Sequence, residues 1–114
     1  MKQIKENLNS LFITACMDGD LIIIILLISF YNDNPQYLYY YDMMLESGLS
    51  RAISNNHLHI LFFFIKKYKK NKHYIDIIKT SFIVADKRSC SKEMINYIKS
   101  CGYMHNNLFK SILI

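Results

Sequence analysis

The residues of this chain that are best suited to metal binding or acid–base catalysis are four histidines, His57, His59, His73 and His105. His57 and His59 are two positions apart, so on a helix their rings point to different faces. No cysteine or carboxylate cluster accompanies them, and we therefore expect no metal site. The sequence also lacks a Ser/His/Asp order, a glycine-rich phosphate loop and paired carboxylates at catalytic spacing. We predict a protein that is not an enzyme, with no catalytic residues and no cofactor.

Three cysteines are the other reactive side chains: Cys16, Cys90 and Cys101. Their number is odd and they form no C-x-x-C pair, which argues against a disulfide scaffold and for a reducing compartment. We expect Cys16 to be buried and inert, and Cys90 and Cys101 to be more exposed. The polar N-terminal residues have no apolar signal-peptide core, so a cytoplasmic location is predicted.

The elements that must position these residues follow a repeated pattern. Three alanines, 37 and then 33 residues apart, each follow an apolar residue three positions earlier and precede an isoleucine thirteen positions later. Such a repeat is typical of helix–turn–helix units that stack, because one unit alone cannot cover its apolar face. The predicted core residues of the repeats are Phe12, Ala15, Gly19, Leu21, Ile28, Leu49, Ala52, Leu58, Ile65, Phe82, Ala85 and Ile98.

Residues 15–28 and 52–65 are the two clearest copies, and the first resembles an ankyrin repeat in its Ala-x-x-x-Gly-x-Leu-x-Ile-Ile-x-x-Leu-Ile pattern. The resemblance covers about residues 8–105. It implies an all-α stack of about three helical pairs in which β-hairpins are reduced or absent. His57 corresponds to the turn histidine of the family, which bonds local backbone. The second repeat lacks the glycine, and no copy contains the Thr-Pro-Leu-His opening.

The boundaries follow from the spacing of apolar and turn residues. The 114 residues form one domain, with repeats over about 8–31, 46–68 and 78–101 and a terminal helix over about 106–114. Residues 36–46 suit a helix after Pro35 or a tyrosine-rich strand, and we favour the helix. Ser47 and Gly48 are expected to end it. Asp18 or Asp20, Asn56 and Ser91 are expected to form turns and caps.

The apolar run 21–31 allows two interpretations. It is about half the ~20 residues that a membrane-spanning helix needs. Because it is apolar nearly all round, we expect burial on more than one face within the stack. A membrane-surface segment is the alternative.

Two segments between the predicted helices are candidate partner-binding sites. One is a tyrosine-rich connection and the other a basic run, and each also has a plain structural explanation, in packing or in a solvated connector. The candidate residues are Tyr37, Tyr39, Tyr40, Tyr41, Lys66, Lys67, Tyr68, Lys69 and Lys70.

The sequence is 52% hydrophobic and has a formal net charge of +5. Its composition and repeats resemble the degenerate ankyrin-type proteins of large DNA viruses, namely the multigene families of African swine fever virus and the poxvirus ankyrin proteins. That resemblance implies a non-enzymatic protein that binds host proteins and modulates host defence or host range. The alternative is a basic nucleic-acid-binding or membrane-surface module, with nucleic acid the less favoured partner. The apolar residues after 106 also predict self-association through the terminal helix.

Overall fold

The protein is all-α in the part of the chain that a computed structural model describes, residues 2–102, which contains no strand. The expected terminal helix at 106–114, His105 and the predicted self-association lie outside these residues. The elements in order are α1 (Lys2–Asp18), α2 (Leu21–Asp33), the 3-10 turn η1 (Pro35–Tyr37), α3 (Leu38–Ser54), α4 (Leu58–Lys67), α5 (Lys72–Val84), the 3-10 turn η2 (Lys87–Ser89) and α6 (Lys92–Ser100).

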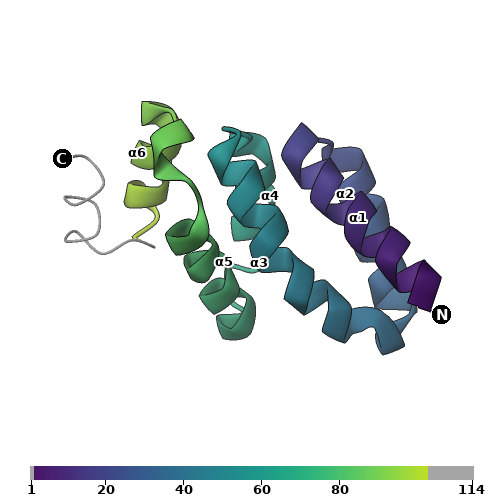
Figure 1. Ribbon diagram of the computed structural model, residues 1–114. Coiled ribbons are helices and arrows are strands. Elements are labelled where there is room, and N and C mark those ends of the chain that lie inside the picture. Colours follow the sequence, from purple (N-terminus) through teal and green to yellow (C-terminus); the bar gives the residue numbers. More distant parts are fainter. Residues whose placement is uncertain (1, 103–114) are drawn as a thin grey trace.

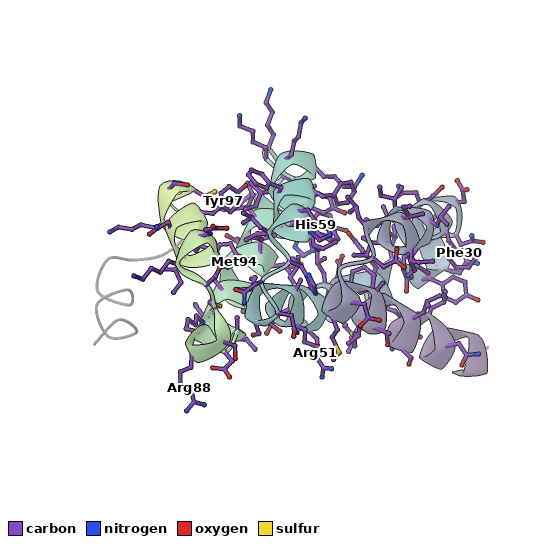
Figure 2. The ribbon with its side chains drawn as sticks, turned by 90° about the horizontal axis from the view of Figure 1, so that it is seen from above. Phe30, Arg51, His59, Arg88, Met94 and Tyr97 are labelled. Carbon is purple, nitrogen blue, oxygen red and sulfur yellow. The ribbon has the colours of Figure 1, made fainter. Side chains whose placement is uncertain are left out.

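The helices follow one another as three helix–turn–helix pairs placed in a row (Figure 1). The first helices of the pairs form one layer, in which α3 packs against α1 on one side and α5 on the other. The second helices α2, α4 and α6 form the other layer. Seen from above, Arg51 projects from α3 of the first layer and Arg88 from the turn η2, whereas Tyr97 lies in the second layer beside α4 (Figure 2). Buried side chains from both layers make one continuous core.

Helix α3 runs without interruption through Ser47 and Gly48, so the predicted break there is wrong. The reason is packing: a Cβ built on Gly48 would lie 2.8 Å from Cε1 of Phe12 and 2.9 Å from Sγ of Cys16. The glycine therefore allows α1 and α3 to approach each other closely. It serves the contact between two helices rather than a turn. The helical alternative for residues 38–46 is confirmed.

The turns between paired helices confirm the predicted caps. The side chain of Asp20 accepts a hydrogen bond from the amide of Ile23, and that of Ser91 from the amide of Met94. Gly19 and Asn56 both have positive φ, of 76° and 64°. The sequence did not lead us to expect the cap of α5, where Asn71 accepts a hydrogen bond from the amide of Tyr74.

The third pair differs from the first two around its alanine. Ala15 and Ala52 lie inside the last turns of α1 and α3, but Ala85 follows the end of α5 in an extended conformation. A longer connection with η2 then leads to α6. Eight of the twelve residues predicted for the repeat core are buried: Phe12, Ala15, Ile28, Leu49, Ala52, Phe82, Ala85 and Ile98. The other four, Gly19, Leu21, Leu58 and Ile65, are half-buried.

Candidate functional site

The tyrosines of the predicted binding segment lie mostly inside the protein. Tyr37, Tyr41 and Tyr68 are buried, Tyr40 is half-buried, and only Tyr39 is largely exposed, at 69%. Aromatic packing explains this placement, because the ring of Phe12 meets Tyr41 edge-on with centroids 5.8 Å apart. The interpretation of Tyr37, Tyr41 and Tyr68 as partner contacts is therefore corrected, and their role is to fill the core.

Hydrogen bonding and stacking join Tyr41 of α3, Tyr68 at the C-cap of α4 and Tyr74 of α5 into one cluster. The hydroxyls of Tyr41 and Tyr68 are 2.5 Å apart, and the rings of Tyr68 and Tyr74 stack with centroids 4.2 Å apart. Burial raises the pKa of Tyr41, Tyr68 and Tyr74, and it raises the pKa of Tyr31 from 10.0 to about 12. The cluster is thus a set of neutral, structural phenols at physiological pH.

Two of the described histidines contact backbone carbonyl oxygens, and the third contacts a carboxylate. Nε2 of His57 lies 2.6 Å from the carbonyl oxygen of Met17, and Nε2 of His59 lies 2.8 Å from that of Gly19. Nε2 of His73 instead meets a carboxylate oxygen of Asp42 at 3.0 Å. Each of these histidine contacts connects two neighbouring helix–turn–helix pairs, so the imidazole rings stabilise the packing of one pair against the next. Among residues 2–102, no group of three potential metal-binding side chains is present.

The cysteines are free thiols in different surroundings. Cys16 is fully buried, and this burial raises the pKa of its thiol to about 12. Cys90 is half-buried, and its Sγ donates to the carbonyl oxygen of Ile53 at 3.4 Å. Cys101 is also half-buried but lines an open cleft. Cys16 therefore matches the expected inert thiol, whereas Cys101 faces a candidate binding surface.

The helix α2 is less buried than its composition predicts. Ile24, Leu27 and Ile28 pack inward. Ile22 and Leu26 are instead 72% and 61% exposed. The expectation of burial on more than one face is wrong because α2 belongs to the first pair of the row and has a neighbouring second-layer helix on one side only (Figure 1). No helix in residues 2–102 is long and apolar enough to cross a bilayer.

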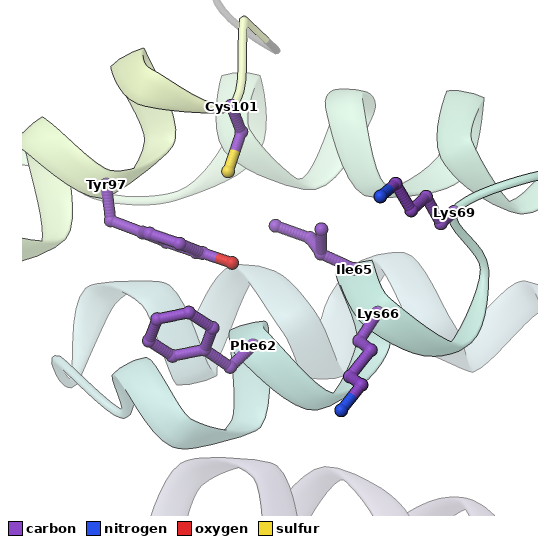
Figure 3. Close-up of a pocket in the computed structure, with 6 residues that line it drawn as sticks. All are labelled: Phe62, Ile65, Lys66, Lys69, Tyr97 and Cys101. Carbon is purple, nitrogen blue, oxygen red and sulfur yellow. The ribbon is translucent and has the colours of Figure 1, made fainter.

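Two clefts flank α4 on the second layer, and they are the strongest candidate site. The α4–α6 cleft, of about 390 Å³, is shown in Figure 3. Its lining residues are Phe62, Ile65, Lys66, Lys69, Tyr97 and Cys101. The α2–α4 cleft, of about 250 Å³, is lined by Ile25, Ile28, Ser29, Asn32, Phe63 and Lys67.

The helical period of α4 explains why one helix serves both clefts. Phe62 and Lys66 are four positions apart in α4 and both line the α4–α6 cleft, and Lys69, in the turn after α4, completes the lining. Phe63 and Lys67, each next in sequence to a residue of that set, face α2. Both clefts consequently have an apolar part and, toward the C-terminal end of α4, lysine side chains. The aromatic residues 62–64 were the sequence feature that could have indicated these clefts. Of the three, only Phe64 is fully buried.

The predicted basic segment lies on the surface at the same end of α4. The lysine run, defined as Lys66, Lys67, Lys69, Lys70 and Lys72, is exposed throughout. Within residues 2–102, none of these lysines forms an ion pair with a carboxylate, whereas His73 pairs with Asp42 and Arg88 with Asp86. Five like charges without carboxylate partners make this end of the second layer positively charged.

Comparisons of the sequence with protein-family models and with curated proteins found no match, and neither did the comparison with solved structures.

Proposed function

We propose that this chain is a non-enzymatic protein-binding module built as an ankyrin-like stack. One observation carries the proposal: the second layer leaves large apolar side chains uncovered around two clefts. Ile25 and Phe62 line these clefts and are 45% and 50% exposed. Exposed apolar side chains beside clefts with polar rims are typical of interaction sites in proteins.

The resemblance to repeat proteins of large DNA viruses supports a more specific proposal. In that setting the chain acts inside an infected cell, in the cytoplasm, where it binds host proteins and modulates host defence or host range. The row of three helical pairs supports such a role, since a stack of this type presents a rigid surface for shape-complementary binding. Its aromatic anchor on that surface is Phe62, in place of the buried tyrosines.

The experiment compares capture of partners from lysate of candidate host cells by the wild type and by two matched variants. The variant Ile25→Ser/Phe62→Ser removes apolar area from both clefts. The control Met43→Ser/Val84→Ser removes similarly exposed apolar side chains from the first-layer helices. We expect proteins that the wild type and the control retain and that the cleft variant loses. Identical capture by all three, or no capture, would contradict the proposal.

The lysine run supports one second candidate, a module that binds an anionic membrane surface or nucleic acid. Lysines beside exposed apolar residues favour anionic lipid interfaces, and Lys contacts to phosphate give nucleic-acid binding that weakens steeply with salt. Flotation with vesicles containing phosphatidylserine and salt titration of binding to a DNA oligonucleotide distinguish these activities from protein binding.

A further inference from the structure

We infer that the occupant of the α4–α6 cleft is an acidic amphipathic helix of a partner protein. This inference rests on the proposed function, and it adds the chemistry of the partner segment and the order of its apolar and acidic groups along α4. Three observations support it: the shape of the cleft, the order of apolar and charged groups along it, and the absence of carboxylate partners for its lysines among the described residues.

The apolar part of the cleft is a preformed recess. The rings of Phe62 and Tyr97 pack with centroids 4.3 Å apart and form one wall. Figure 3 shows the thiol of Cys101 and the side chain of Ile65 directed into the space in front of that wall. A volume of about 390 Å³ accommodates one or two large aliphatic or aromatic side chains. A lipid surface would lie across this recess without filling it, so the shape favours a side chain that inserts.

Charge and apolar surface are arranged in a fixed order along the cleft. Phe62 lies about one helical turn before Lys66, and Lys69 lies in the turn that follows the C-terminal end of α4. A helix that inserts apolar residues beside Phe62 thus brings the next turn of its own surface to Lys66 and Lys69. Carboxylates at that turn would meet two ammonium groups, which gives a helix-in-groove interface with polarity.

The positive charge of the lysine run is available to such a partner. Lysine in the last turn of a helix offsets the helix dipole, but this effect is limited to the final turn. The run continues beyond α4 through Lys69, Lys70 and Lys72, and none of its members is neutralised by a carboxylate within the described part of the chain. Charge complementarity therefore selects an acidic segment rather than a neutral or basic one.

The test uses fluorescence anisotropy with the full chain and two labelled synthetic helical peptides of equal length and identical leucine positions. One peptide has glutamates on its polar face and the other has lysines there. We expect the glutamate peptide to bind at least tenfold more tightly than the lysine peptide, and its affinity to fall at least tenfold in the variant Lys66→Glu/Lys69→Glu. The matched control Lys87→Glu/Lys92→Glu, which changes the net charge equally outside the cleft, should retain most of the affinity.

Several results would overturn the inference: equal affinity for both peptides, no binding of the glutamate peptide, or equal losses in the two charge variants. Binding of phosphatidylserine vesicles that depends on Lys66 and Lys69, without peptide binding, would assign the cleft region to lipid instead. The lysate experiment separates this failure from failure of the proposed function. If captured proteins depend on Phe62 but not on Lys66 and Lys69, the chain is a binding module and only the acidic partner is wrong.

Discussion

Gly48 of α3 lies directly against the ring of Phe12 in α1, and the space for a Cβ at Gly48 is already occupied by that ring and by the sulfur of Cys16. Both neighbours are fully buried, so neither can swing aside into solvent. The contact determines how closely the first two helical pairs approach each other.

Substitution of this glycine should therefore destabilise the protein even though alanine is the better helix former. Overpacking costs about 1–3 kcal/mol and helix propensity returns about 0.5–1 kcal/mol, so we expect Gly48→Ala to lower the free energy of unfolding by about 1–2 kcal/mol. Urea unfolding followed by circular dichroism measures this change. The double variant Gly48→Ala/Cys16→Ala should lose less than the sum of its single variants. A stabilised Gly48→Ala protein would show that the two helices are not in close contact.

Gly19 offers a second steric test, because backbone conformation and a neighbouring ring both restrict it. Its φ is +76°, and a Cβ there would lie 2.7 Å from Nδ1 of His57. We expect Gly19→Ala to destabilise the protein by about 2 kcal/mol, of which roughly 1 kcal/mol is the cost of left-handed backbone for a non-glycine residue. Gly102 is the control, since it has φ of +69° and open space around it. Gly19→Ala should lower the free energy of unfolding more than Gly102→Ala does, and adding His57→Ala to Gly19→Ala should restore part of the loss. If either result fails, the contact between Gly19 and the ring of His57 is absent.

Asn56 bridges the turns of the second and third pairs with its side-chain amide. It donates to the carbonyl oxygen of Ser89 and accepts from the amide of Ser91, while its own φ is +64°. Asn56→Gly removes the two bonds but suits the backbone, so we expect a loss of about 1–2 kcal/mol in unfolding free energy. Asn56→Ala adds backbone strain and should lose about 1 kcal/mol more. Equal thermal midpoints for the glycine variant and the wild type would mean that the bridge contributes nothing.

Alkaline pH should unfold this protein through its buried tyrosines. The pKa of Tyr31 rises from 10.0 to about 12 on folding, and burial raises those of Tyr41, Tyr68 and Tyr74 as well. The folded state therefore keeps protons that the unfolded state releases, so the stabilisation is complete below pH 10 and is lost as the pH rises toward 12. Chemical denaturation at pH 8 to 11.5, with tyrosinate absorbance as a second signal, tests this. A free energy of unfolding that stays constant above pH 10 would contradict the burial of these phenols.

The three thiols should react with a thiol reagent in the order Cys101, Cys90, Cys16. Cys101 lines an open cleft, Cys90 is half-buried with its thiol bonded to a carbonyl and its pKa raised by desolvation, and Cys16 is fully buried with a pKa of about 12. Mass spectrometry of peptides after timed alkylation at neutral pH gives the three rates. Modification of Cys16 as fast as Cys101 in the folded protein would show that the core around Phe12 is open.

The sequence predicted the parts of this fold that depend on local chemistry. Asp20 and Ser91 cap the helices that follow them, and Asn56 adopts the left-handed conformation, because each feature is decided by a residue and its immediate neighbours. Gly48 was misread since a glycine within an apolar pattern gives the same signal whether it ends a helix or admits a neighbouring one. Only the packing partner, 36 positions earlier in the chain, distinguishes the two.

The candidate site was harder to predict than the helices for the same reason. Phe62 and Phe64 are identical residues in one apolar run, yet one is half exposed and the other fully buried. Tyr39 and Tyr41 differ in the same way. Which of two neighbouring aromatic side chains meets solvent depends on where the adjacent helices lie, and hydrophobicity alone does not encode that. The lysine run lies on the surface because five ammonium groups without carboxylate partners are costly to bury.

The turn contacts also bear on how the protein loses its structure. The carbonyl oxygens of Met17 and Gly19 in the first pair form hydrogen bonds with imidazoles of the second pair. The side chain of Asn56 in the second pair forms hydrogen bonds with the backbone of Ser89 and Ser91 before the last helix of the third pair. Opening any one pair therefore breaks these hydrogen bonds, each of which contributes about 0.5–1.5 kcal/mol, in addition to the loss of apolar contact. Units in a linear array unfold together when such interface energies are large relative to the energy of a single unit. These few hydrogen bonds thus favour cooperative loss of all three pairs over fraying from one end, and a single melting transition for the whole row.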